Sequence, residues 1–201
     1  MSTPPAESDR RPMGAVLVGG HSLRMGRDKA RLVLGGRSLA ERAGELLRPL
    51  TRTVVFVGGE PDGWPGPHLQ DAQAERGPLA GVVAALRQAD VLVLACDLPH
   101  IPPAFLAELL LTDGVLDGAL YSGQAAGSQP LAALYRRSAL PAAELTLASD
   151  RPSMEAFVSR IHVRRLDDLA LRQLGLDAGI FTNLNHPGDY QQLLAMEHPR
   201  A

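Results

Sequence analysis

Short runs of apolar residues alternate along the chain with segments in which apolar residues recur every three or four positions. The clearest runs cover residues 14–18, 53–57 and 91–95, and unbroken runs of this kind are typical of strands buried on both faces of a parallel sheet. A helical segment between two such strands makes them pair in parallel. The pattern therefore predicts a single Rossmann-like three-layer αβα domain with a mostly parallel central sheet.

Helix starts are marked by particular residues. Ser38 and Glu41 have the spacing of a capping box, and we expect the helix that they begin to stop at Pro49. Pro78 suits the first position of a second helix, because the N–H group that proline lacks has no helical partner there. A short strand before this helix would end at Asp71, at the edge of the sheet.

The chain beyond Asp117 has a less regular pattern. Residues 122–128 are mostly small, and they fit either a hairpin that covers a substrate or a disordered connector. The other elements that we expect are helices over residues 104–111, 138–149, 153–158 and 187–196, and strands over residues 118–121, 129–135, 161–166 and 180–185.

The composition narrows the class of protein. With 201 residues, 45% of them hydrophobic and 21% charged, the sequence fits one globular domain, which we place at residues 13–201 after a flexible tail over residues 1–12. The net charge of −2 argues against general nucleic-acid binding. No apolar run approaches the roughly 20 residues that span a bilayer, so we expect no membrane association.

The single cysteine, Cys96, excludes an internal disulfide and a zinc site built from cysteines. Residues 1–12 also lack the apolar core of a signal peptide, and both observations favour a cytoplasmic protein. Cys96 adjoins a buried run, which favours a small apolar role over that of a nucleophile. For Trp64, in a loop rich in proline and glycine, we favour local packing over stacking on a base.

Candidate chemistry gathers after the first apolar run. The run ends at the pair Gly19 and Gly20, and the loop that follows carries Arg24, Arg27 and Lys29. Glycines let the backbone N–H groups approach a ligand, while guanidinium and ammonium groups supply positive charge. The loop fits neither the Walker pattern nor the dinucleotide-binding fingerprint, but its chemistry suits a polyphosphate.

Asp97 follows the apolar run at residues 91–95, which we expect to be a central strand. Ligands of open α/β sheets bind outside the carboxyl ends of the strands, so Asp97 should meet the glycine-rich loop there. A carboxylate beside bound phosphates can hold Mg²⁺, although it can also cap a helix. Asn183 and Asn185 lie two apart on an expected strand and would face one side, where they either orient an acceptor phosphate, complete a metal shell or only end the strand.

Residues 17–29 have the pattern L-x-G-G-x-S-x-R-M-G-x-D-K, in which the chain resembles the molybdenum cofactor guanylyltransferases. Four further segments extend the resemblance, at residues 77–81, 96–103, 129–135 and 181–189. The resemblance implies a nucleotide-diphospho-sugar transferase-like fold. It also implies that Lys29 binds the nucleotide phosphates, that Asp97 binds nucleotide and Mg²⁺, and that further nucleotide contacts come from Leu17, Val18, Gly19 and Asp71.

The implied reaction is Mg²⁺-dependent transfer of GMP from GTP to the terminal phosphate of molybdenum-molybdopterin, giving molybdopterin guanine dinucleotide and pyrophosphate. Arg24, Lys29 and Asp97 would be its catalytic residues, with the bound cation offsetting phosphate charge in the transition state. Transient contacts with cofactor-synthesis proteins or apo-molybdoenzymes would fit this role. The alternatives are a relative that transfers CMP, to molybdopterin or to another small phosphorylated acceptor, and a nucleotide-binding paralogue without activity.

Three positions depart from the family pattern. Val18 replaces the usual alanine, and His186 replaces a threonine in the closing motif. An asparagine that helps hold the nucleotide in some relatives is missing after the second strand, where this chain has Val57, Gly58 and Gly59. These differences concern recognition of the base more than handling of the phosphates.

Overall fold

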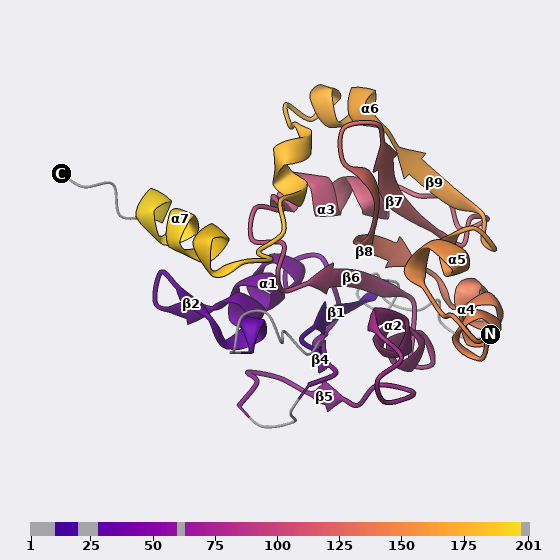
Figure 1. Ribbon diagram of the computed structural model, residues 1–201. Helices are drawn as coiled ribbons and strands as arrows, with labels where there is room; N and C mark the ends of the chain where they lie inside the picture. Colours follow the sequence, from indigo (N-terminus) through magenta and orange to yellow (C-terminus); the bar gives the residue numbers. More distant parts are fainter. Residues whose placement is uncertain (1–10, 20–27, 60–62, 198–201) are drawn as a thin grey trace, which may run out of the picture.

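A seven-stranded sheet runs through the computed structural model, which describes residues 11–19, 28–59 and 63–197 (Figure 1). Its strands, in spatial order, are β5 (His68–Leu69), β4 (Val54–Val57), β1 (Met13–Leu17), β6 (Val91–Ala95), β8 (Gly127–Tyr135), β7 (Gly118–Gly123) and β9 (Val163–Leu166). Within this described sheet, β8 alone runs against the others, because it pairs antiparallel with both β6 and β7 while the remaining pairs are parallel. The predicted, mostly parallel sheet is therefore confirmed.

Both faces of the sheet are buried, as unbroken apolar strands require. Val16 of β1 and Leu92 of β6 belong to one core cluster, while their neighbours Ala15 and Val93 belong to a second cluster on the opposite face. Helices α1 (Leu39–Leu47) and α3 (Pro103–Leu110) cover the first face, and α2 (Pro78–Leu86), α4 (Leu140–Leu147) and α5 (Met154–Val158) cover the second. This arrangement confirms the three predicted layers.

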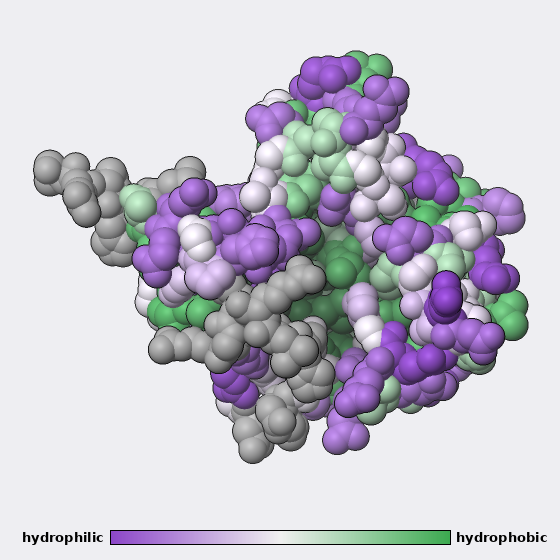
Figure 2. Space-filling view, in the orientation of Figure 1, coloured by the Kyte–Doolittle hydropathy of each residue, from purple (hydrophilic) through white to green (hydrophobic). Residues whose placement is uncertain are grey.

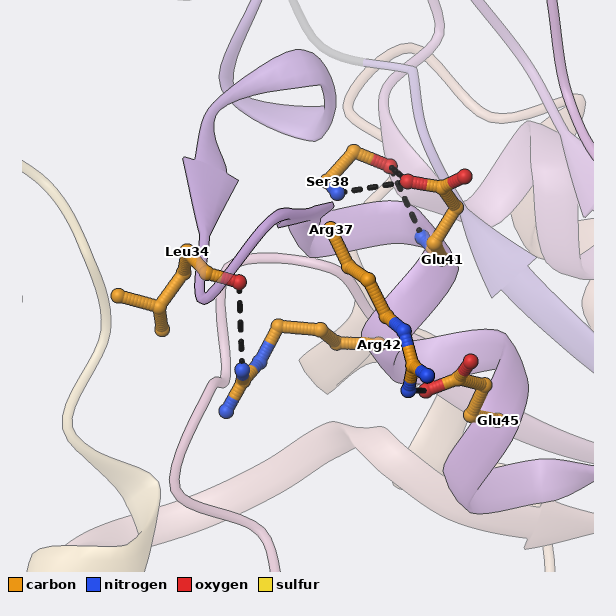
Figure 3. A network of polar contacts seen from close by, with 6 residues as sticks. All are labelled: Leu34, Arg37, Ser38, Glu41, Arg42 and Glu45. Atoms are coloured by element: carbon orange, nitrogen blue, oxygen red, sulfur yellow. Dashed lines mark hydrogen bonds and ion pairs between the residues drawn. The ribbon is translucent and has the colours of Figure 1, made fainter. Parts of the chain in front are cut away.

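The entrance to α1 is built as its sequence predicts. The Ser38 backbone N–H donates to Glu41 Oε2 at 2.7 Å, and the Glu41 N–H donates to Ser38 Oγ at 3.2 Å, which completes the capping box (Figure 3). The helix follows a small hairpin of β2 (Val33–Leu34) and β3 (Arg37–Ser38). Arg42 of α1 donates to the Leu34 carbonyl at 3.3 Å and thereby ties the hairpin to the helix.

The prediction of a strand over residues 180–185 is wrong. Residues Ala178–Phe181 form a short 3-10 helix, η4, that begins where Asp177 accepts a hydrogen bond from the Gly179 N–H at 2.7 Å. Phe181 then packs edge-on against Phe105 and stacks on Tyr121, with ring centroids 5.2 and 4.5 Å apart. A cap and an aromatic cluster therefore decide the structure of a segment whose apolar residues suggested a strand.

Two more helices lie in the C-terminal part of the chain. Helix α6 (Asp168–Gln173), which the apolar pattern did not reveal, starts where Asp167 accepts from the N–H groups of Leu169 and Ala170. Helix α7 (Pro187–Glu197) follows the loop after η4, as predicted. None of the helices in the described ranges combines the length and the hydropathy of a membrane span. The predicted N-terminal tail lies, up to residue 10, outside the described residues.

Candidate functional site

Three polar side chains from distant parts of the sequence meet at the carboxyl edge of the sheet. Lys29 Nζ lies 3.8 Å from Asp97 Oδ2 and donates a hydrogen bond to Asn185 Oδ1 at 3.3 Å. Lys29 is the first residue of the short 3-10 helix η2 (Lys29–Arg31), and Asp97 lies two residues after the end of β6. The predicted convergence of the lysine and the aspartate at the end of the central strands is therefore what the fold produces.

The backbone around each of these side chains is held by its own contacts. Asp28 caps η2 by accepting from the Ala30 N–H at 3.0 Å, which fixes the chain at Lys29. The Leu184 N–H donates to the Asp97 carbonyl at 3.0 Å, and so joins the C-terminal loop to the end of β6. Asp189 accepts from the N–H groups of Asn185 and His186, both at 2.8 Å. The site is thus assembled from pre-ordered backbone.

The electrostatics of the site favour a bound cation. Burial raises the pKa of Asp97, and the Lys29 ammonium opposes that shift. Burial also raises the pKa of Asp71, against the opposing effect of His68. Burial is the largest cause of both shifts, and it disfavours the ionised form of each carboxylate unless an opposite charge lies beside it. A divalent cation, which prefers carboxylate oxygens, would supply the missing charge.

A metal ion here would need ligands from its substrates. In the described ranges of the chain, no group of three or more His, Cys, Asp and Glu side chains is placed to hold a metal by itself. Mg²⁺ is commonly bound by one or two carboxylates together with phosphate oxygens and water. Asp97 therefore fits the donor set of a nucleotide-dependent metal site better than that of a permanent metal centre.

Glycines bring three backbone segments together beside Asp71. A Cβ atom added to Gly58 would lie 3.0 Å from Asp71 Oδ1, and one added to Gly81 would lie 3.1 Å from the same oxygen. A Cβ atom on Gly19 would lie 3.1 Å from the Gly59 nitrogen. The ends of β1 and β4 and the start of α2 therefore approach one another closely only because these positions carry no side chain. From the sequence, Gly58 and Gly59 were notable because they stand where some relatives have an asparagine; the close packing that they allow could not be predicted.

The predicted nucleotide contacts of Leu17 and Val18 are limited by the sheet. The Leu17 carbonyl accepts from the Cys96 N–H at 3.3 Å, and the Val18 N–H donates to the Val57 carbonyl at 3.0 Å. Both side chains are buried in the core, whereas Gly19 is exposed. Gly19 is thus the first residue after β1 that is exposed.

The remaining predicted site residues differ in how the structure places them. Arg24 lies outside the described residues, so its role stays a prediction. Asn183 and Asn185 do not share a strand, because the segment after η4 is irregular, so the strand from which we expected them to face one side is absent from this described segment. Both are exposed, and of the two Asn185 makes the side-chain bond to Lys29. No motif in the sequence announces that bond, because it depends on how the loop before α7 folds back.

Two residues set aside from the chemistry have the expected packing roles. Cys96 is buried, and burial raises the pKa of its thiol, so that it is neutral and part of the core. Trp64 stacks on Phe56 with ring centroids 5.7 Å apart, and Arg31 lies over its ring at 4.7 Å.

The surface near the site is hollowed. Figure 2 shows a depression with an apolar floor and a polar rim over β6 and its neighbours. A cavity of about 410 Å³ is lined by residues of α1, of the β2–β3 hairpin and of the loop after β6, among them Arg37, Arg42 and Cys96. Of the predicted catalytic and nucleotide-binding residues that the structure describes, none lines it. The convergence of charged side chains, and not this cavity, therefore defines the candidate site.

Comparison with known proteins agrees with this geometry. Residues 14–168 match the family model of the MobA-like NTP transferase domain. A probable molybdenum cofactor guanylyltransferase from Carboxydothermus hydrogenoformans is 33% identical over 189 residues, which cover 90% of this chain and 93% of the relative. Another from Opitutus terrae is 38% identical over 158 residues, or 74% of this chain and 78% of the relative.

Solved structures share the fold. The crystal structure of molybdopterin-guanine dinucleotide biosynthesis protein A from Archaeoglobus fulgidus has a TM-score of 0.77 and 26% identity, covering 92% of this chain and 97% of its own. A structure of Rv0371C from Mycobacterium tuberculosis in complex with manganese has a TM-score of 0.59 and 17% identity, covering 92% and 98%. The fold is that of the nucleotide-diphospho-sugar transferases. Since the family model spans most of the sequence, the chain belongs to the MobA-like NTP transferase domain family.

Proposed function

We propose that this chain transfers GMP from GTP to molybdenum-molybdopterin, giving molybdopterin guanine dinucleotide and pyrophosphate. The observation that carries the proposal is the meeting of Lys29, Asp97 and Asn185 at the carboxyl edge of the sheet. It occurs in a family whose curated relatives bear the name molybdenum cofactor guanylyltransferase. The site suits a reaction between two phosphate groups, because it offers charge rather than a nucleophile.

In the proposed reaction, an oxygen of the acceptor phosphate bonds to the α-phosphorus of GTP while the bond to the β-phosphate breaks. Both reactants are anions, so catalysis consists of holding them in line and balancing their charge. Lys29 would neutralise a phosphate oxygen, and the hydrogen bond from its ammonium to Asn185 Oδ1 at 3.3 Å supports a fixed orientation of that group. Asp97 is the carboxylate that would hold Mg²⁺, which when bound neutralises phosphate charge and assists departure of pyrophosphate. No covalent enzyme intermediate is required.

The nucleotide would lie on the side of Asp97 where β1 and β4 end. Gly19, Gly58 and Asp71 lie on that side, where a Cβ atom added to either glycine would meet neighbouring protein atoms at 3.0–3.1 Å, so the backbone segments pack tightly there. Discrimination of guanine requires groups that hydrogen-bond its edge, since a wrong base would leave them unpaired. We assign Arg24 to the phosphates together with Lys29, and expect the backbone of residues 17–19 to contact the nucleotide through Gly19 above all.

The test supplies molybdenum-molybdopterin, Mg²⁺ and each of the four nucleoside triphosphates separately. Pyrophosphate release and the mass of the product are followed together. We expect turnover with GTP and a product of the mass of the guanine dinucleotide. A preference for CTP would assign the chain to the CMP-transferring alternative, and no turnover with any triphosphate would leave only nucleotide binding. Repeating the assay with Mn²⁺ would show whether the choice of Mg²⁺ is correct.

We also infer a cytoplasmic location and transient contacts with cofactor-synthesis proteins or apo-molybdoenzymes. The product of the proposed reaction is a cofactor that has to reach another protein, which supports a transient partner. Co-purification with and without GTP would test that contact.

A further inference from the structure

The hairpin of β7 and β8 extends past the carboxyl end of the central strands. Strand β8 pairs antiparallel with β6, and Leu94 lies opposite Ala132. Residues 127–131 of β8 continue beyond that pair, which is the last that the two strands make. The turn at residues 123–127 therefore lies on the carboxyl side of β6, at the edge of the sheet that carries the site.

A single carboxylate fastens this turn to the body of the protein. Asp168, the first residue of α6, accepts the Tyr121 hydroxyl through Oδ1 and the Gln124 N–H at 3.1 Å through Oδ2. The Gln129 side chain closes the turn from inside by donating to the Ala126 carbonyl at 2.7 Å. Burial raises the pKa of Tyr121 to about 12, so its hydroxyl is a donor at neutral pH, while that bond lowers the pKa of Asp168.

The packing at Gly123 is built around the same pair. A Cβ atom at this position would lie 2.2 Å from the Tyr121 hydroxyl oxygen and 2.7 Å from Asp168 Oδ1. Both distances are far below van der Waals contact, so any side chain here would push the tyrosine and the carboxylate apart. The turn is therefore held by hydrogen bonds to Asp168 and by a close approach that only glycine permits.

The fastened hairpin is joined to the catalytic edge by one short segment. The Tyr121 ring stacks on Phe181 with centroids 4.5 Å apart. Three residues further along the chain, Leu184 donates to the Asp97 carbonyl, and Asn185 accepts from Lys29. The hairpin, the loop after η4 and the Asp97 loop therefore pack as neighbours.

The strand order separates the two sides of the site. The residues that we assign to the nucleotide follow the ends of three strands on one side of β6: Gly19 follows β1, Gly58 follows β4 and Asp71 follows β5. Strands β8 and β7 lie on the other side of β6. Asp97 stands between the two groups of strands. The second substrate must approach Asp97 from the side that the nucleotide does not occupy, and that side is bounded by the hairpin turn.

We propose that Asp168 is a positioning residue, which holds the hairpin turn at residues 123–127 as the wall of the site on the side of the phosphorylated acceptor. The inference rests on the proposed function, because it presumes transfer to a second phosphorylated substrate. Asp168 itself acts through Tyr121 and Gln124 and need not touch either substrate.

The test compares Asp168→Ala with Asp167→Ala in the GMP-transfer assay. Asp167 caps the same helix by accepting from two N–H groups, but among the described residues it makes no hydrogen bond to the hairpin, so it controls for loosening of α6. We expect Asp168→Ala to raise the KM for the acceptor about tenfold while the KM for GTP stays within about twofold, and Asp167→Ala to change neither value by more than about twofold. Tyr121→Phe removes only the hydroxyl oxygen that donates to Asp168, and it should raise the KM for the acceptor about threefold to fivefold. This variant replaces Asp168→Ala in the test if Asp168→Ala does not fold.

The outcomes separate the two proposals. Three outcomes would overturn the inference: equal effects on the two KM values, equal effects of the Asp168 and Asp167 variants, or an acceptor KM that stays unchanged in both Tyr121→Phe and Asp168→Ala. In each case, turnover by the wild-type protein would still support the proposed function. A wild-type protein that transfers GMP to no acceptor would overturn the proposed function, and the inference with it.

Discussion

Lys29 Nζ stands 3.8 Å from Asp97 Oδ2, with 19% and 29% of the two side chains exposed. That separation is longer than a hydrogen bond, so each group keeps capacity for a ligand. The pair is partly shielded from water, which strengthens its interaction with an incoming phosphate relative to a fully exposed pair. Lys29 is also the only lysine in the sequence, beside nineteen arginines.

The Lys29→Ala variant should remain folded but lose at least about 100-fold in kcat/KM, or about 2.7 kcal/mol of transition-state stabilisation. Steady-state kinetics with circular dichroism as a folding check would measure this. Arg48→Ala, which removes an exposed positive charge from the end of α1, is the matched control. Activity of Lys29→Ala within about threefold of wild type would show that Lys29 takes no part in catalysis.

Because other lysines are absent from the sequence, acylation of lysine side chains should inactivate the protein, and bound GTP should protect it.

The Asp97→Asn variant should need far more Mg²⁺ for half-maximal rate, since the amide has the shape of the carboxylate but no charge for the cation. The rate is titrated with Mg²⁺ for both proteins. Asp113→Asn, at an exposed position, controls for the loss of one negative charge. The same magnesium dependence in Asp97→Asn and wild type would place the metal elsewhere.

Asn185 and Asn183 should behave differently, although they lie two residues apart. Asn185→Ala removes the amide oxygen that orients Lys29, and we expect kcat/KM to fall about tenfold, equivalent to about 1.4 kcal/mol. Asn183→Ala should stay within about twofold, because its exposed side chain makes no hydrogen bond to the other residues that the structure describes. Equal losses in the two variants would show that the bond between Asn185 and Lys29 does not matter for the reaction.

Gly58 and Gly36 offer a matched pair for the nucleotide side of the site. Both have φ of +80°, so alanine at either position should destabilise the fold by about 1–2 kcal/mol. At Gly36 nothing lies within 4 Å of the added carbon, whereas at Gly58 it would meet Asp71 Oδ1 at 3.0 Å. Gly58→Ala alone should therefore weaken GTP binding, by about tenfold in calorimetry. Unchanged affinity would remove Asp71 from the proposed nucleotide contacts.

The capping box predicts a pH dependence of stability. The Ser38 N–H, and then its hydroxyl, hold the pKa of Glu41 below its ordinary value of 4.5. Because the folded state favours the ionised form, this contribution is complete above about pH 4.5 and is lost as the pH falls through the lower folded-state pKa. Urea unfolding at pH 7, 5 and 4 should show a shallower acid loss in Glu41→Gln than in wild type. The same slope in both proteins would contradict the prediction.

The fold could be predicted because its determinants are local or periodic. Apolar runs at β1, β4 and β6 bury both faces of the sheet, and the Ser38 and Glu41 spacing marks the start of α1. The structure of residues 180–185 could not be predicted, because Asp177 caps a tight helical turn and Phe181 packs between Phe105 and Tyr121. The aromatic partners of Phe181 are distant in the sequence, and no periodic pattern of apolar residues indicates them.

The candidate site divides in the same way. Asp97 could be placed from its position after a central strand, and Lys29 from its position beyond the glycine pair. The bonds of Asn185 to Lys29 and of Asp168 to the hairpin depend on loop paths that no pattern encodes. The extent of the single domain stays a prediction, as does the role of Arg24.

The place of β6 between β1 and β8 has a consequence for synthesis of the protein. Strand β1 precedes β6 in the chain, but β8 follows it only after α3 and β7. A nascent chain that has released β6 but not β8 presents an open edge of Val-Leu-Val-Leu-Ala, apolar on both faces, and such edges recruit other strands. A fragment ending before β8 would therefore aggregate instead of folding as a smaller nucleotide-binding protein. The two halves of the molecule share one strand, and neither is complete without the other.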